Sequence, residues 1–348
     1  MQDKKSGKQK SSSRLLLAVL LIILAGASCA FFIWRSRLVI ENAAVRKYRT
    51  SGILDTSGPF RSDVPEGYSV FLARPASIQV SADPDFGSSF SIEGKAGINR
   101  IENLIPGKTY YYRAVYGGKP SIKHSFRTSG QIRMLSVEGI VNVRDIGGWK
   151  TEDGKSIRYG KIFRGSELDG DHGLHVTGNG IRQLKDVGIR TEIDLRNDSE
   201  TRNAVFPIKD FAEYKKYSIT SYMGVAKEKE LYRDLFIEVI NSINEDKPVY
   251  IHCWAGADRT GTVIALIEGS LGVSKEDVIK DYQLTTLSNA GDRRYGKGDE
   301  GRKFEQLINY IESEYEGASF GEKCRNYLTG LGISENDLDK FRSNMLEP

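Results

Sequence analysis

The stretch that decides the fold is PVYIHCWAGADRTGT, residues 248–262. A short apolar run ends in His252 and Cys253, a loop with a glycine follows, and Arg259 precedes an apolar helical pattern that starts near Thr260. Ligands bind outside the carboxyl ends of the strands in open α/β sheets. We therefore expect Cys253 at the tip of a buried strand, in a sharp loop that leads into a helix.

The chemistry of this loop suits an oxyanion. Backbone N–H groups around such a turn form an anion-binding nest, and the amino terminus of the helix adds partial positive charge. Arg259 adds a planar fork that matches two phosphate oxygens. These surroundings favour the thiolate of Cys253, which would attack phosphorus and form a phospho-cysteine intermediate that water hydrolyses. We expect backbone or side-chain contacts to phosphate from five loop residues, Trp254, Ala255, Gly256, Ala257 and Thr260.

The leaving oxygen needs a proton donor close to the loop. Asp258, beside Arg259, is the first candidate. Asp194 is the second, because the pattern IDLR ends a neighbouring strand and directs Asp194 and Arg196 to the same sheet edge, where Arg196 is a further candidate phosphate ligand. A structural ion pair between Asp194 and Arg196 is an equal alternative. Thr260 can donate a hydrogen bond to the sulfur. This mechanism requires no metal and no other cofactor.

The sequence resembles the cysteine-based phosphatases, whose HCx5R(S/T) loop is matched by HCWAGADRT, and the DRTG ending is similar to the bacterial tyrosine phosphatases. Four further segments resemble that family in the same order: NVRDIGG at 142–148, FRGSEL at 163–168, GIRTEIDLRNDSE at 188–200 and LGVSKEDVIKDYQLT at 271–285. The resemblance spans about 138–290 and implies a phosphotyrosine or similar phosphomonoester as substrate. It also implies supporting roles for His252, Arg144 and Arg164: His252 orients the loop, and the two arginines brace it from beneath or steer anions.

One position departs from the family pattern. Members usually have lysine before the loop aspartate, where this chain has Ala257. That lysine helps to bind polyanionic head groups, so its absence favours a singly phosphorylated substrate. A dual-specificity or phosphoinositide and inositol-phosphate phosphatase is the alternative within the class. A catalytically silent phosphate-binding module is the alternative from another class.

The patterns divide the chain into two folded regions. Over 130–348, strand and helix patterns alternate, which predicts an α/β fold with a mostly parallel sheet flanked by helices, as in cysteine phosphatases. Over 59–129, short alternating strands predict a small all-β sandwich. Its LIPGKTY corner at 104–110 resembles a fibronectin type III-like domain. We favour a spacer role for it over a carbohydrate or protein contact module. Residues 35–58 are expected to be a polar linker.

The amino terminus carries a targeting signal. Residues 15–34 are twenty uncharged, apolar residues behind a basic tail at 1–14, which predicts a cytoplasmic tail and a transmembrane anchor that contacts the membrane. A cleaved signal peptide, which would secrete the protein, and a lipid-modified Cys29 are the alternatives, in that order. Each reading places the catalytic region outside the cytoplasm, in the periplasm or on the cell surface.

Charge and cysteine content exclude other classes of protein. The net charge is +4, and the tail alone holds five Lys and Arg residues, so no basic field for nucleic acid is present elsewhere. Three cysteines without a CxxC pair do not support a disulfide framework or a cysteine-rich zinc site.

Overall fold

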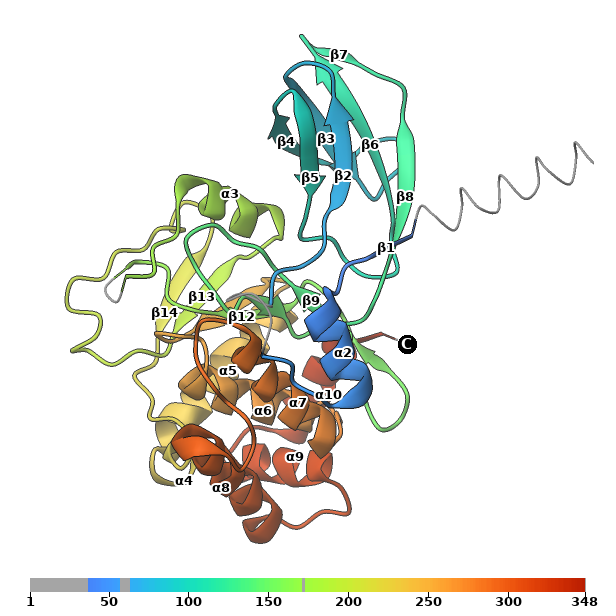
Figure 1. The fold of residues 1–348 in the computed structure, drawn as a ribbon. Helices are drawn as coiled ribbons and strands as arrows, with labels where there is room; N and C mark the ends of the chain where they lie inside the picture. The colour runs from blue at the N-terminus through green and yellow to red at the C-terminus, as the bar shows by residue number, and fades with distance from the viewer. Residues whose placement is uncertain (1–36, 57–62, 171–172, 348) are drawn as a thin grey trace, which may run out of the picture.

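The structure is a computed structural model that describes residues 37–56, 63–170 and 173–347. A β-sandwich lies beside a larger α/β region (Figure 1). Within the described residues, no helix combines the length and the apolar character needed to cross a membrane. The predicted cytoplasmic tail and anchor, residues 1–34, lie outside the part of the chain that the structure describes.

The α/β region is organised around a six-stranded sheet. The strand order is β14 (Glu213–Lys216), β13 (Thr191–Asp194), β15 (Val249–His252), β12 (Ile162–Gly165), β10 (Arg144–Asp145) and β9 (Arg133–Met134). The first four strands run parallel to one another, β10 runs antiparallel to β12, and β9 runs antiparallel to β10. The predicted mostly parallel sheet is therefore confirmed.

Two hydrophobic cores cover the two faces of this sheet. Tyr250 and Phe163 point to one face and pack near Leu184 of α3 (Gly178–Asp186). Ile251 and Ile193 point to the opposite face, which the remaining helices cover. Neighbouring residues of a strand point to opposite faces, so these short strands can be apolar on both sides.

The helices on the second face follow the apolar patterns of the sequence. They are α4 (Gly224–Lys227), α5 (Lys229–Asn244), α6 (Asp258–Ser270), α7 (Lys275–Leu284), η1 (Thr285–Leu287), α8 (Gly298–Glu314), α9 (Phe320–Gly330) and α10 (Glu335–Met345). The side chain of Ser274 accepts a hydrogen bond from the amide of Asp277, so it caps α7. A short ribbon of β11 (Ser156–Ile157) and β16 (Leu346–Glu347) ties the end of the chain to this region.

The sandwich is built from two sheets. The larger has the order β1 (Arg37–Val39), β8 (His124–Ser129), β6 (Thr109–Tyr116), β3 (Ala76–Ser81) and β4 (Phe90–Gly94), with β7 (Lys119–Pro120) also on β6. The smaller pairs β2 (Tyr68–Leu72) with β5 (Gly97–Ile101). Side chains of both sheets, including Val70, Ile78 and Phe126, share one core. The hydroxyl of Tyr110 accepts a hydrogen bond from the amide of Ile105, a corner found in several sandwich folds.

Residues 35–58 differ from the polar linker that we expected. Within this stretch, β1 pairs in parallel with β8 of the sandwich. The helix α2 (Ala43–Ser51) places Val45 and Tyr48 in the core of the α/β region. Only these two residues of α2 are buried, so its sequence shows a weak apolar pattern. The segment therefore connects the two regions through structure that packs on both.

Candidate active site

Cys253 lies where a buried strand meets a buried helix. β15 ends at His252, and α6 begins at Asp258, two residues before the expected start. We call residues 253–259 the cysteine loop. Cys253 is a free cysteine with 3% of its surface exposed. The expected strand, loop and helix are confirmed, and the positive end of the α6 dipole lies at the loop.

The carbonyl groups of the cysteine loop are held from one side. Asn142 Nδ2 donates to the carbonyls of Ala255 and Gly256, at 3.1 and 3.0 Å. Arg164 Nη2 donates to the carbonyl of Gly256 at 2.8 Å. In a planar trans peptide the N–H group points opposite to the C=O group. The amides of Gly256 and Ala257 therefore point away from these anchors, toward the opposite side of the loop, as an anion-binding nest requires.

The two predicted supporting arginines lie beneath this loop. Arg144 Nε and Arg164 Nη1 donate to the two carboxylate oxygens of Asp281, at 2.9 and 2.7 Å. Arg144 Nη1 also donates to Asn142 Oδ1 at 2.7 Å. Burial alone would raise the pKa of Asp281, but the two arginines hold it below its ordinary value. All four side chains are buried, so this geometry favours bracing of the loop over steering of anions.

Gly256 makes the close packing of the loop possible. Its backbone has φ of 64°, in the left-handed region that favours glycine. A Cβ atom at this position would lie 2.1 Å from the carbonyl oxygen of Gly165 in β12. A side chain at Gly256 would therefore push the loop off the strand that supports it.

His252 is buried between two carboxylates. Its Nε2 lies 3.0 Å from Glu192 Oε1, and its Nδ1 lies 4.0 Å from Asp194 Oδ1. Burial alone would lower the pKa of His252, but Asp194 and Glu192 raise it to about 9. The Nδ1 atom of His252 lies 3.3 Å from the carbonyl oxygen of Cys253, so an imidazolium here adds positive charge at the start of the cysteine loop, in keeping with the supporting role expected for His252.

Arg259 is held by a carboxylate that the sequence did not single out. Its Nη1 and Nη2 donate to the two oxygens of Glu200 at 2.5 and 2.7 Å, and Nη1 also donates to the carbonyl of Leu195 at 3.4 Å. Burial alone would lower the pKa of Arg259, but Glu200 and Cys253 raise it above its ordinary value. Glu200 follows the strand β13 and ends a segment of family resemblance, which is the only sequence signal for it.

Asp258 is oriented by two residues that the sequence did not single out either. Its carboxylate accepts hydrogen bonds from Tyr222 at 2.5 Å and from Arg293 Nε and Nη2 at 2.6 and 3.0 Å. Tyr222 has φ of 55°, a strained conformation for a bulky residue, and its hydroxyl lies 2.8 Å from that of Tyr282. Asp258 therefore lies at the cysteine loop in a fixed orientation.

Asp194 and Arg196 pair with each other away from solvent. Arg196 donates to Asp194, Glu167 and Asp169 through Nε, Nη1 and Nη2, which uses all of its N–H groups. Burial would raise the pKa of Asp194, but His252 and Arg196 hold it below its ordinary value. The expectation that Arg196 binds phosphate is corrected, because it has no donor left. For Asp194 the geometry favours the ion-pair alternative over the acid.

Trp254 and Thr260, the two remaining predicted phosphate ligands, differ in their exposure to solvent. Trp254 is 47% exposed at the rim of the loop. The hydroxyl of Thr260 is buried and has no hydrogen-bond partner among the described residues. A bond from Thr260 to the sulfur of Cys253 therefore stays a prediction.

The comparisons with known proteins agree with this geometry. The model of the tyrosine phosphatase family matches residues 135–347, which is more than half of the chain. The chain belongs to the tyrosine phosphatase family. It is a phosphatase enzyme of the protein-tyrosine-phosphatase type, and its substrate is phosphorylated.

Two curated proteins and one solved structure resemble parts of the chain. A Cupriavidus necator protein named as a tyrosine-protein phosphatase is 23% identical over 58% of this chain and 70% of its own length. A Nostoc commune tyrosine-protein phosphatase is 23% identical over 46% of this chain and 67% of its own length. Among solved structures, TpbA of P. aeruginosa is 12% identical, with a TM-score of 0.31, over 51% of this chain and 91% of that chain.

Proposed function

We propose that this tyrosine phosphatase family member hydrolyses phosphotyrosine or a similar phosphomonoester through a phospho-cysteine intermediate on Cys253. The observation that carries the proposal is the anchoring of the loop carbonyls by Asn142 and Arg164, which turns the loop amides toward the opposite side of the loop. Those amides and the remaining N–H groups of Arg259 are suited to hold three phosphate oxygens opposite the sulfur.

The proposed reaction has two displacements at phosphorus. The thiolate of Cys253 forms an S–P bond as the ester P–O bond breaks. Asp258, which must first take up a proton against its ion pair with Arg293, gives that proton to the leaving oxygen. A water molecule then attacks phosphorus, the S–P bond breaks, and Asp258 accepts the proton of the water. A hydrogen bond from Thr260 would stabilise the departing thiolate in this second step.

A test uses the full-length protein with p-nitrophenyl phosphate. The expected result is turnover in wild type and loss of turnover in Cys253→Ser. Cys324→Ser should keep near wild-type turnover, because Cys324 is a buried residue of α9 that packs on Gly269 of α6 and not on the cysteine loop. Acid quenching during turnover should trap a phosphorylated protein that Cys253→Ser does not form. Vanadate binding without turnover in wild type would instead support the silent phosphate-binding module.

A second candidate, a phosphoinositide or inositol-phosphate phosphatase, is favoured by one observation. Arg293 brings a cation to Asp258 at the cysteine loop, although Ala257 replaces the usual loop lysine. If the substrate is polyanionic, Arg293→Ala should lower kcat/KM for inositol polyphosphates more than for phosphotyrosine. Arg294→Ala is the matched control, because Arg294 pairs with Asp292 on the surface.

For the whole chain we propose a membrane-tethered enzyme with an extracytoplasmic catalytic region. The apolar stretch 15–34 supports the tether. The corner at Tyr110 and the two packed sheets support a fibronectin type III-like spacer between the tether and the catalytic region. Protease added to spheroplasts, whose outer envelope is opened, should digest the protein, and a cytoplasmic control protein should stay intact; protection of both would contradict the location.

A further inference from the structure

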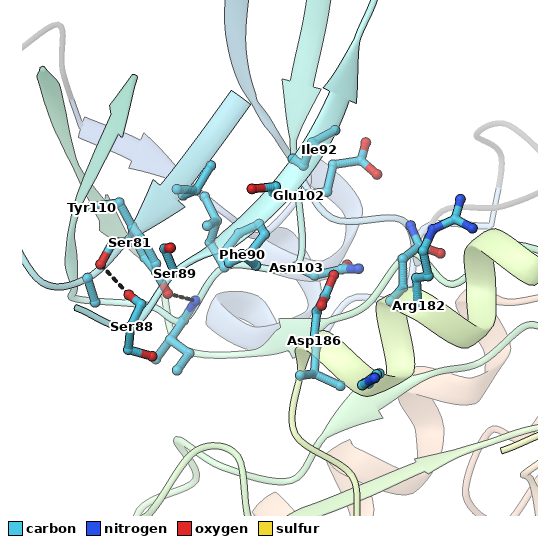
Figure 2. A pocket seen from close by; sticks show the side chains of 18 of the residues that line it. Ser81, Ser88, Ser89, Phe90, Ile92, Glu102, Asn103, Tyr110, Arg182 and Asp186 are labelled. Carbon is cyan, nitrogen blue, oxygen red and sulfur yellow. Dashed lines mark hydrogen bonds between the residues drawn. The ribbon is translucent and has the colours of Figure 1, made fainter. Parts of the chain in front are cut away.

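A large cleft of the described residues lies between the sandwich and α3. It is a cleft of about 1440 Å³, and no residue of the cysteine loop lines it. One wall is β4 with its preceding turn, and another is the helix α3, from which Arg182 and Asp186 are drawn (Figure 2). Val187 and Arg190 after α3 and residues 102–105 also line the cleft. We call it the strand–helix cleft. An open strand edge facing a helix across a groove is the arrangement in which PDZ domains bind extended peptides.

The lining shows that the cleft meets the edge of β4 and not one of its faces. Phe90, Ser91, Ile92 and Glu93 are consecutive, and all of them line the cleft. Alternate residues of a strand point to opposite faces, so a groove over one face would contact only every second residue. β4 is also the terminal strand of the larger sandwich sheet, paired only with β3 among the described strands.

The register identifies which backbone groups face outward. The carbonyl of Ala114 in β6 accepts a hydrogen bond from the loop after β7, so Ala114 bonds away from β3. Its partner Ile78 in β3 therefore bonds to β4, where it lies opposite Ile92. The backbone groups of Ser91 and Glu93 then point out of the sheet, and no backbone partner for them occurs among the described residues.

The helix wall of the cleft is positively charged. Arg182, Lys185 and Arg190 line it, and the first two act electrostatically on the neighbouring Asp186. Asp186 is the acidic residue among the lining residues of this wall, so the three basic side chains give the wall a net positive charge. On the sandwich side, Asp83 already accepts hydrogen bonds from the amides of its own turn, Glu102 pairs with Arg100, and Glu93 is an exposed acid of β4. An extended chain with acidic side chains toward α3 would fit this charge.

We propose that the strand–helix cleft binds an extended acidic peptide segment of a partner protein, which adds as a strand to the outer edge of β4. Five extended residues span roughly 17 Å, a length suited to β4. The amino-terminal tail of the chain itself does not match this chemistry, because its first fourteen residues hold five Lys and Arg residues and one Asp. The docking surface is separate from the cysteine loop and would recruit a partner without contacting the reacting phosphate.

The test measures fluorescence anisotropy with full-length protein and two labelled decapeptides, one of alternating Glu and Val and one of alternating Lys and Val. We expect the acidic peptide to bind at least tenfold more tightly than the basic one. Ser91→Pro removes an outward N–H group and should weaken the acidic peptide about tenfold or more. Ser91→Ala, which keeps that N–H group, should bind like wild type.

Two further measurements keep the test decisive. Ser91→Pro should retain hydrolysis of p-nitrophenyl phosphate, which shows that it folds; if it does not fold, Arg182→Glu replaces it and should reverse the preference between the two peptides. Equal binding of both peptides by wild type, or no effect of either variant, overturns the proposal. So does a dimer in light scattering that Ser91→Pro converts to a monomer, since β4 would then pair with a second copy of the chain.

Discussion

Glu200 binds the end of the Arg259 guanidinium, because its two carboxylate oxygens accept hydrogen bonds from the two terminal nitrogens at 2.5 and 2.7 Å. A guanidinium has five N–H donors. Glu200 and the carbonyl of Leu195 use both donors of Nη1 and one of Nη2. Nε–H and the second N–H of Nη2 remain, and they share one edge of the guanidinium. Glu200 thus fixes the plane of Arg259 and leaves an edge that matches two phosphate oxygens.

Glu200→Ala should therefore lower phosphatase activity without removing any group that touches phosphate. The lost charge-assisted hydrogen bonds hold Arg259 in place, and they correspond to roughly a 10- to 100-fold fall in kcat/KM. Steady-state kinetics with p-nitrophenyl phosphate and inhibition by vanadate measure the effect. Glu228→Ala is the control, because it also removes a glutamate, but one that accepts a hydrogen bond from Thr220 and not from Arg259. Tighter vanadate binding by Glu200→Ala would show that Glu200 blocks the site.

Asp258 is the proposed acid, and its role depends on the leaving group. Asp258→Asn keeps the shape of the side chain but cannot donate the proton. Phenyl phosphate has a basic leaving group, so its kcat should fall about 100-fold or more. p-Nitrophenyl phosphate has a stable leaving anion, and its kcat should fall much less.

Asp194→Asn is the comparison for this experiment. Asp194 bonds Arg196 and lies beneath the site, so its loss should affect both substrates to the same extent. The assignment to Asp258 fails if the leaving-group dependence appears in Asp194→Asn and not in Asp258→Asn.

The sequence predicts those parts of the site that local patterns control. The apolar run before His252, the glycine in the loop and the helical pattern after Arg259 place Cys253 correctly, because each depends on neighbours in the chain. Glu200 and Arg293 come from loops, and Tyr222 has a strained backbone. Their positions depend on how distant segments pack, so no local pattern indicates their partners.

The same distinction explains the corrections. Arg196 follows a strand directed at the site, and the sequence predicts that position correctly. The sequence does not show that Glu167 and Asp169, from the loop after β12, use its remaining donors. In α2, burial of only two residues against distant helices stabilises a segment that by itself has the composition of a linker.

Gly256→Ala should remove activity because no side chain fits between the cysteine loop and Gly165. Alanine at this φ is strained, and its Cβ would displace the loop whose amides are proposed to bind phosphate. We expect kcat/KM to fall more than about 100-fold, because small displacements in an active site are costly. Gly154→Ala is the control that separates backbone strain from a steric clash, because Gly154 has φ of 85° but open space where a Cβ atom would lie. It should keep full activity and lose about 1 kcal/mol of stability.

His252 should make the stability of the fold depend on pH. Its pKa is about 9 in the folded protein, raised by Asp194 and Glu192 against the effect of burial, and about 6.5 when unfolded. Below about pH 6.5 both states bind the proton, so the stabilising contribution is complete. Between about pH 6.5 and 9 the unfolded state releases the proton first, and the contribution is lost, on the order of 3 kcal/mol in all.

Urea denaturation of wild type and His252→Gln at pH 6 and pH 9.5 measures this contribution. The difference in free energy of unfolding between the two proteins should be larger at pH 6 and shrink at pH 9.5. His124→Gln is the control, because His124 is exposed on β8 and stacks on Tyr112 away from any carboxylate pair. A difference between wild type and His252→Gln that is constant with pH would mean that His252 is neutral in the fold and adds no positive charge at the cysteine loop.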